Sequence, residues 1–309
     1  MESAAIGIFD SGLGGLTVAR EIARALPHES LVYLGDTARC PYGPRDLSEV
    51  RGFVVEIGSW LLAQHVKFIV IACNTATAAG LTLAQQAFNV PVVGVIEPGA
   101  RAAVMATNNR RVGVIGTVGT IESGAYSHAV RALDAGVTVF SAATPRFVEI
   151  AEEGLRLDVG PVEGLIAESA DVFVRPSFHE IARDYLDPLK RSGIDTLVLG
   201  CTHYPLLSAS IQQVVGPRVR LISSAHETAL EVAEMLARKG QLAHASTSGP
   251  RHRFATTGDA SEFSRLGSRV FGRELGEVTT VSLDELADSV VGDVPTLSQD
   301  SATGEASCA

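Results

Sequence analysis

The stretch "IVIACNT" at residues 69–75 decides the fold, because an apolar run ends at a cysteine and polar residues follow at once. The same order returns in "LVLGCTH" at residues 197–203, with three aliphatic residues, a small residue, a cysteine and two polar residues. Continuous apolar runs of this length are typical of buried parallel strands. A cysteine is often only a small buried hydrophobe, so either stretch alone indicates no chemistry.

A second pair of stretches supports a repeat within the chain. "IGIFDSG" at residues 6–12 precedes the first cysteine stretch, and "VGVIGTV" at residues 112–118 precedes the second. The second half is longer, and residues 155–177 can hold the excess. Chance similarity between apolar strands could explain either pair alone. Two pairs in the same order favour two related halves.

Short apolar runs alternate with longer stretches of helical period, such as residues 16–26 and 46–65. This alternation predicts βαβ units and parallel sheets, and therefore an α/β fold. The expected strands are residues 6–9, 31–34, 68–72, 92–95, 112–115, 137–140, 197–200 and 220–222.

Composition excludes several classes of function. The 309 residues carry a net charge of −10 without a Lys/Arg cluster, so we expect no direct binding of nucleic acid. No apolar run approaches the roughly 18 residues of a membrane helix, and the first residues lack the features of a secretory signal. Four scattered cysteines do not make a disulfide framework, so we expect a reducing cytoplasm.

Cys73 and Cys201 are the first candidates for chemistry. Ligands of open α/β sheets bind beyond the carboxyl ends of the strands, where both thiols are expected. If the halves face each other, the two thiols point into one cleft. One could then take a proton from a tetrahedral carbon while the other delivers a proton to the opposite face, which inverts the carbon without a cofactor. An unperturbed thiol titrates near 8.5, close enough to neutrality for both roles.

Asp10 opens "DSGLGG", whose glycines and Ser11 could hold an anion at the start of a helix. A tight strand-to-helix turn, with Asp10 as a plain N-cap, is the alternative. Thr17 stands where a dinucleotide fingerprint requires its last glycine, and there is no Walker A motif. We therefore expect no nucleotide cofactor.

The turn-rich stretch "GDTARCPYGPR" at residues 35–45 also follows an expected strand. Tyr42 and Gly43 could offer a hydroxyl and a backbone amide to a carboxylate, although a rigid surface turn explains them as well. Cys40 has no partner nearby in the sequence and is expected to be a bystander. His203 follows Cys201 closely and could tune its thiol, or could be a structural histidine. No CxxC, HExxH or paired-His spacing supports a metal site.

Eight motifs, in order over roughly residues 5–285, are shared with one enzyme family. Together they resemble the glutamate racemases, cofactor-independent amino-acid racemases that supply D-glutamate for peptidoglycan. The motifs are "IGIFDSGLGGLTV" (6–18), "YLGDTARCPYGPR" (33–45), "IACNTATA" (71–78), "PVVGVIEPG" (91–99), "VGVIGT" (112–117), "PRFVEIAEEG" (145–154), "LVLGCTHYPLL" (197–207) and "FATTGD" (254–259).

The resemblance implies a role for each matching residue. Cys73 and Cys201 would be the catalytic acid/bases, acting on D- and L-glutamate respectively. Asp10 would assist Cys73, while His203 and Glu152 would assist Cys201; a shift of one residue would exchange Glu152 with Glu153. The positions that would bind the substrate are Asp10, Ser11, Tyr42, Gly43, Asn74, Thr75, Thr202 and His203.

The resemblance also implies two pseudosymmetric parallel-sheet α/β domains with the active site in the cleft between them. Residues 1–98 and 223–285 would form the first domain, and residues 99–222 the second, with a longer segment near 155–177. The small and polar residues 286–309 are expected to be a disordered tail. A homodimer with L- and D-glutamate as ligands is expected, and no cofactor. The open alternatives are a racemase of aspartate or another acidic amino acid, and a thiol redox or ligand-binding module.

Overall fold

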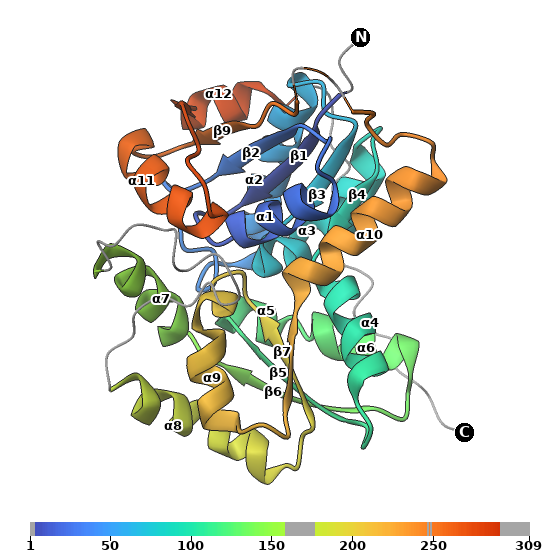
Figure 1. The fold of residues 1–309 in the computed structure, drawn as a ribbon, viewed down its shortest axis with the longest axis vertical. Helices are drawn as coiled ribbons and strands as arrows, with labels where there is room; N and C mark the ends of the chain where they lie inside the picture. The colour runs from blue at the N-terminus through green and yellow to red at the C-terminus, as the bar shows by residue number, and fades with distance from the viewer. Residues whose placement is uncertain (1–3, 158–176, 246, 248, 291–309) are drawn as a thin grey trace.

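The chain forms two lobes, each built around one parallel sheet (Figure 1). The computed structural model describes residues 4–157, 177–245, 247 and 249–290. In the first sheet the strands lie in the order β10-β9-β2-β1-β3-β4, and in the second β6-β5-β7-β8. The strands of the first sheet are β1 (Ile6–Asp10), β2 (Leu31–Gly35), β3 (Phe68–Ile71), β4 (Val92–Gly94), β9 (Arg253–Thr256) and β10 (Val278–Thr280). Those of the second are β5 (Arg111–Gly116), β6 (Thr138–Ala143), β7 (Thr196–Gly200) and β8 (Arg220–Ser223).

The predicted α/β fold with two parallel sheets is confirmed. Every strand pairing in both sheets is parallel. All eight expected strands form, with bounds that differ by a few residues at most. Asp10 is the last residue of β1 rather than the first residue after it. Strands β9 and β10 were not predicted, and they extend the first sheet at the edge beyond β2.

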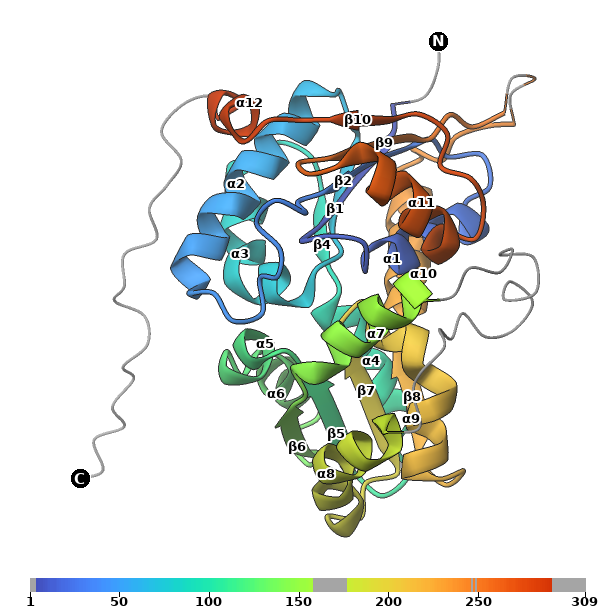
Figure 2. The same ribbon diagram turned by 90° about the vertical axis from the view of Figure 1, so that its left-hand side faces the viewer.

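Helices cover both faces of the first sheet, as Figure 2 shows in side view. One face carries α1 (Leu16–Ala25), α10 (Ser224–Arg238) and α11 (Ala260–Phe271), whose apolar side chains share one core. The other face carries α2 (Leu47–Ala63), α3 (Asn74–Ala87) and α12 (Leu283–Asp288), packed around a second core. Burial on both faces explains why these strands read as continuous apolar runs.

The second sheet is covered in the same way. On one face, α4 (Ile96–Ala106) and α6 (Ala125–Leu133) pack on β5 and β7. The other face meets α7 (Arg146–Leu157), α8 (Phe178–Arg191) and α9 (Ser208–Val215), with the aromatic cluster of Phe147, Phe178 and Tyr204 between them. Two short helices, α5 (Val118–Glu122) and the 3₁₀ helix η2 (Tyr204–Leu207), follow β5 and β7.

The expected start of the disordered tail is wrong. Residues 286–288 belong to α12, whose N-cap Ser282 accepts a hydrogen bond of 3.0 Å from the backbone N–H of Glu285. Leu286 is fully buried, and Trp60 of α2 donates its indole N–H to Glu285 over 3.0 Å. Ordered packing therefore continues past residue 285. Residues 291–309, like most of the longer segment near 155–177, lie outside the described residues.

The C-terminal strands β9 and β10 lie in the first sheet although the second sheet comes before them in the chain. We propose that each sheet marks one domain, with boundaries near residues 98 and 222. Helix α4 spans the first boundary and packs on β7 and β8. Helix α10 begins just after the second boundary. It packs on α1 of the first lobe and on α4 of the second lobe. Among the described residues, no helix has the length and apolar character needed to cross a membrane.

Candidate active site

Cys73 lies between β3 and α3 as the N-cap residue of that helix. Its backbone is extended, and its Sγ accepts a hydrogen bond of 3.5 Å from the backbone N–H of Ala76. The Ser11 hydroxyl, from the loop after β1, lies 3.9 Å from Sγ. Only 6% of the residue is exposed. The strand end thus holds a buried thiol in a single orientation beside the start of a helix.

Cys201 occupies the matching place after β7 in the second sheet, and it too is buried. Its Sγ lies 3.8 Å from Nδ1 of His203. The other ring nitrogen of His203, Nε2, lies 3.4 Å from Oε1 of Glu152 on α7. A thiol, an imidazole and a carboxylate therefore follow one another in a row.

The loops at the carboxyl ends of the two sheets meet. The hydroxyl of Thr202, beside Cys201, donates to Oδ2 of Asp10 over 3.2 Å. The Thr17 hydroxyl of α1 lies 3.2 Å from the carbonyl oxygen of Thr202. A Cβ added at Gly14 would lie 2.4 Å from the Thr202 hydroxyl and 2.7 Å from Nδ1 of His203. Only a glycine allows the two loops to approach so closely.

A second contact between the lobes lies beside Cys73. The Thr75 hydroxyl lies 2.9 Å from that of Thr117 and 3.2 Å from that of Thr120, both in the second lobe. Gly119 donates its backbone N–H to the carbonyl of Gly43 over 2.9 Å. These contacts fix how the strand ends of the two sheets face each other.

Asp10 is fully buried at the end of β1. Its Oδ1 accepts a hydrogen bond of 2.9 Å from the backbone N–H of Gly12, while Oδ2 takes the bond from Thr202. Burial raises the pKa of this carboxyl, although the charge on His203 and the hydrogen bonds oppose the rise. Asp10 therefore connects the Cys73 side of the site to the Cys201 side.

The two thiols lie in different electrostatic surroundings. Burial, followed by the charge of Asp10, raises the pKa of Cys73 to about 12, so this sulfur carries its proton near neutrality. Burial alone would lower the pKa of His203, but Cys201 and Glu152 together raise it well above the usual value. An imidazolium beside a sulfur stabilises the thiolate form. The resting site thus has a protonated thiol at Cys73 and a cationic neighbour at Cys201.

Glu152, rather than Glu153, points its carboxylate at His203. Burial raises the pKa of Glu152, but hydrogen bonding and charge from His203, together with Arg156, outweigh burial and lower it. Oε2 of Glu152 lies 3.4 Å from Nη2 of Arg156, one turn further along α7. The carboxylate is therefore held at both of its oxygens.

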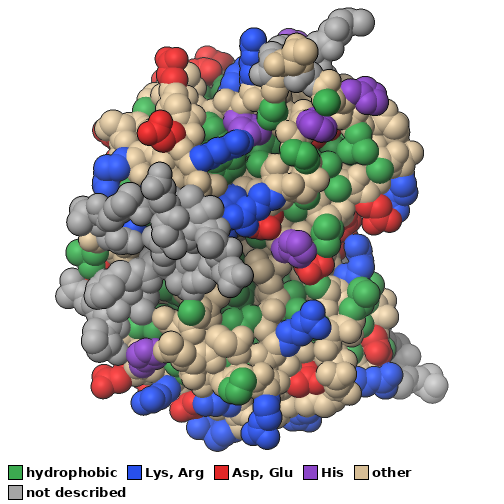
Figure 3. All heavy atoms as spheres, viewed as in Figure 1, with side chains coloured by type: hydrophobic (Ala, Val, Ile, Leu, Met, Phe, Trp, Pro, Cys, Tyr) green, Lys and Arg blue, Asp and Glu red, His purple; other side chains and the backbone are tan. Residues whose placement is uncertain are grey.

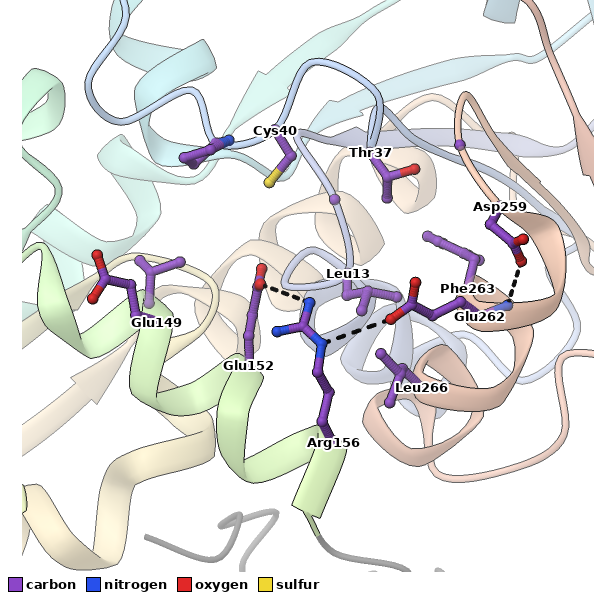
Figure 4. Close-up of a pocket in the computed structure, with 14 residues that line it drawn as sticks. Leu13, Thr37, Cys40, Glu149, Glu152, Arg156, Asp259, Glu262, Phe263 and Leu266 are labelled. Atoms are coloured by element: carbon purple, nitrogen blue, oxygen red, sulfur yellow. Dashed lines mark hydrogen bonds and ion pairs between the residues drawn. The ribbon is translucent and has the colours of Figure 1, made fainter. Parts of the chain in front are cut away.

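A cavity of about 540 Å³ lies next to these groups, between α7 and the loops of the first lobe. Figure 4 shows Glu152 and Arg156 reaching into it from α7, opposite Glu262 and Leu266 of α11. Cys40 lines the same cavity, so the expected bystander lies beside the site. Burial, followed by the charges of Glu152 and Asp10, raises the pKa of the Cys40 thiol far above its usual value.

Asn74 and Thr75 form the first turn of α3 and are almost fully buried. Oδ1 of Asn74 accepts a hydrogen bond of 2.8 Å from the Tyr126 hydroxyl. Its Nδ2 is buried without a hydrogen-bond partner among the described residues. The backbone N–H groups at the start of a helix also lack partners within the helix, and they favour an anion.

The Tyr42 hydroxyl, a predicted substrate contact, has a partner within the protein. Tyr42 is buried, and its hydroxyl donates to Oδ2 of Asp36, a fully buried carboxylate. Asp36 also accepts bonds from Arg39 Nε at 2.6 Å and from the Thr257 hydroxyl at 2.8 Å. This network shapes the loop that carries Gly43. The backbone N–H of Gly43 donates no hydrogen bond to any of the described residues.

Comparison with known proteins identifies the family. A family model described as Asp/Glu/Hydantoin racemase matches residues 6–232. The chain belongs to this racemase family. A glutamate racemase of Bacillus cereus is 46% identical over 281 residues, which cover 91% of this chain and 98% of that protein. A glutamate racemase of Acidothermus cellulolyticus is 47% identical over 281 residues, which cover 91% of this chain and all of that protein.

Solved racemase structures share the whole fold. Glutamate racemase from Bacillus anthracis superposes with a TM-score of 0.81 at 44% identity, over 92% of this chain and 99% of that one. The enzyme from Francisella tularensis, solved in complex with D-glutamate, gives a TM-score of 0.79 at 32% identity, over 92% and 99% of the two chains.

Some residues of this racemase site were not found from its sequence. Thr117 follows β5 where Ser11 follows β1, so the repeat itself contained the signal for this residue. Tyr126 and Arg156 lie within helices, and nothing in their local sequence indicates the site. Among the described residues, no group of three or more His, Cys, Asp or Glu side chains is placed to hold a metal ion.

Proposed function

We propose that this protein is a glutamate racemase, which interconverts L- and D-glutamate by proton transfer at Cα and supplies D-glutamate for peptidoglycan. The observation that carries the proposal is the pair of buried thiols, Cys73 and Cys201, at matching strand ends of two facing sheets. Two such groups on opposite sides of a carbon can invert it without a cofactor. The near-complete coverage of relatives named glutamate racemase supports glutamate as the substrate.

In the L-to-D direction, the Cys201 thiolate takes the Cα proton and becomes a thiol. The electron pair of the broken C–H bond stays on the substrate as a carbanion conjugated with its carboxylate. Cys73 then gives its proton to the opposite face and becomes the thiolate. The D-to-L direction reverses each step, so Cys73 acts on D-glutamate and Cys201 on L-glutamate.

The supporting groups have different tasks in this scheme. His203, backed by Glu152, stabilises the thiolate of Cys201 across 3.8 Å. Asp10 assists Cys73, whose high pKa makes it the proton donor of the resting enzyme. A negative intermediate also gains from nearby positive charge, and the imidazolium of His203 supplies it.

The substrate carboxylates need charge-assisted hydrogen bonds. The start of α3 offers the amide of Asn74 and the hydroxyl of Thr75, and its backbone N–H groups favour an anion. Ser11 and the Gly43 amide approach from the first lobe, with Thr202 and His203 from the second. Of Tyr42, only the backbone remains for binding, because its hydroxyl is used by Asp36.

Racemisation in heavy water tests the proposal. L-Glutamate incubated with the enzyme should give D-glutamate that carries deuterium at Cα, while the remaining L-glutamate carries little label early in the reaction. Unlabelled product would exclude proton exchange with a thiol. A panel of acidic amino acids under the same conditions decides the substrate, because faster turnover of aspartate would favour an aspartate racemase.

The redox alternative makes a different demand on the thiols. It requires a disulfide between Cys73 and Cys201, whereas racemisation requires a substrate carbon between them. Mass spectrometry after mild oxidation distinguishes the two, since the racemase should keep both thiols free.

We further propose a cytoplasmic homodimer that does not bind nucleic acid directly. The dimer rests on the family resemblance alone, and light scattering of the purified protein tests it. The net charge of −10 argues against a phosphate-binding surface. Figure 3 shows Lys and Arg side chains scattered over one face among acidic, polar and apolar ones.

A further inference from the structure

Arg156 lies on α7, one helical turn after Glu152, and contacts carboxylates of both lobes. Its Nη2 lies 3.4 Å from Oε2 of Glu152, and its Nε lies 3.6 Å from Oε1 of Glu262 on α11. Figure 4 shows the guanidinium between the two carboxylates at the wall of the cavity. The resemblance that identified Glu152 gives Arg156 no role.

The contact with Arg156 restricts the Glu152 carboxylate at the oxygen that does not face His203. Glu152 is partly exposed, and its Oε1 faces His203 at 3.4 Å. A carboxylate bound at one oxygen only can rotate about its last side-chain bonds, and this rotation would move the charge away from the imidazole. Because Arg156 takes Oε2, it leaves Oε1 directed at His203.

The contact with Glu262 fixes Arg156 from the other lobe. Arg269 of α11 adds a second connection, since its Nη1 donates to the carbonyl of Leu155 on α7 over 2.6 Å. The end of α7 is therefore attached to α11 at neighbouring residues. The position of the Glu152 carboxylate consequently depends on how the two lobes meet.

We propose that Arg156 is a positioning residue for the Cys201 half of the reaction, holding Glu152 against His203 with Glu262 as its anchor on the opposite lobe. The proposal rests on the proposed racemase activity. Arg156 contacts neither thiol in the described structure, so it acts only through Glu152 and His203.

Other charged and titratable groups also face this part of the cavity. Glu149 is on α7, Cys40 is on the loop after β2, and Asp259 and Glu262 belong to the start of α11. Among the described residues that line this cavity, Arg156 is the only lysine, arginine or histidine. Its removal would leave several carboxylates facing one another, so the pKa of Glu152 should rise and the acidic limb of the rate profile should move to higher pH.

The test compares Arg156→Gln with the wild-type enzyme in both directions. L- and D-glutamate are mirror images, so their equilibrium constant is one and kcat/KM must fall equally in both directions. We expect a fall of about three- to fivefold, the size of a half-exposed ion pair. This fall alone does not identify the affected half-reaction.

Primary deuterium isotope effects identify which of the two half-reactions is slowed. If Arg156 supports Cys201, removal of the L-glutamate proton becomes slower relative to the step at Cys73. The isotope effect on kcat/KM with Cα-deuterated L-glutamate should rise, and that with deuterated D-glutamate should fall. Arg156→Lys should recover part of the rate, and Glu262→Gln should shift both isotope effects in the same directions by a smaller amount.

Arg238→Gln is the matched control, since Arg238 forms an ion pair with Glu234 at the same helical spacing on α10, over 3.3 Å. It should leave both isotope effects unchanged. An unchanged rate, or a fall with the two isotope effects unaltered, would overturn the role of Arg156. If Arg156→Gln does not fold, Glu262→Gln and Arg156→Lys decide the question by the same measurements. A wild-type enzyme inactive on glutamate would instead contradict the proposed function.

Discussion

The Cys73 half and the Cys201 half of the site have the same backbone and different chemistry. In both, a thiol follows an inner strand of a parallel sheet and precedes a helix or a 3₁₀ turn. Cys73 lies near the buried carboxyl of Asp10, and its Sγ accepts one hydrogen bond from the backbone N–H of Ala76. Cys201 lies beside His203, which is followed by Glu152 and Arg156. The repeated fold provides the positions, while the side chains around each thiol give it different surroundings.

Replacing either thiol should give the largest effect. Cys73→Ala and Cys201→Ala each remove one of the two proposed proton carriers, so racemisation should fall by about 10³-fold, within the range for general acid–base groups. Initial rates from both enantiomers by circular dichroism measure the loss. A variant that retained full activity would show that its half of the site does not take part in proton transfer.

Gly14→Ala should disturb the contact between the halves. The new Cβ would lie 2.4 Å from the Thr202 hydroxyl and 2.7 Å from His203 Nδ1, so the loop that follows Cys201 must move. A displacement of this kind should lower kcat/KM by about 10²-fold. Gly52→Ala on α2 is the matched control, because nothing lies within 4 Å of its added Cβ. That control should keep full activity and gain slightly in thermal stability.

Asp10→Asn should change the titration of the Cys73 half. Burial is the main cause of the Cys73 pKa of about 12, and the Asp10 charge adds to it. Without that charge the thiolate is less disfavoured, so the pKa of Cys73 should fall while burial keeps it above the usual value. The pH dependence of Cys73 alkylation, measured in a Cys201→Ala background, should reach half its maximal rate at a lower pH. A shift to higher pH would show that Asp10 stabilises the thiolate.

Tyr42→Phe should have the smallest effect on catalysis. The hydroxyl serves Asp36 rather than the cleft, so the Michaelis constant for glutamate should change by less than about twofold. The free energy of unfolding should fall by about 1–2 kcal/mol, because a buried carboxylate loses one of its donors. Urea unfolding and steady-state kinetics measure the two quantities. A large rise in the Michaelis constant with unchanged stability would show that the Tyr42 hydroxyl contacts the substrate.

The sequence predicted most of the fold because the inner strands of parallel sheets are apolar on both faces. Strands β9 and β10 are not predicted from the sequence because both are short and contain threonine, and because β9 begins with an arginine. Strand β10 is the edge strand, and β9 is the next strand inward. The sequence does not indicate α12, because a six-residue helix with one buried leucine gives little periodic signal.

The candidate site was predictable where strand ends and family motifs coincide, as at Cys73 and Cys201. The choice between Glu152 and Glu153 depends on the phase of α7 against His203, which a linear motif does not define. The direction of the Tyr42 hydroxyl depends on Asp36, six residues earlier in the loop. The contact of Arg156 with Glu262 could not be predicted, because Glu262 lies more than a hundred residues away and in the other lobe.

The presence of both halves in one polypeptide has a consequence for the enzyme's direction of work. Two identical halves related by a true twofold axis would give both sulfurs the same affinity for a proton, and neither would be predisposed to begin as donor. Covalent joining lets the two copies carry different neighbours, so the proposed mechanism can begin with the transferable proton on the Cys73 side. In the proposed mechanism each turnover leaves the proton on the other sulfur, so the enzyme must reset before it can accept the same enantiomer again.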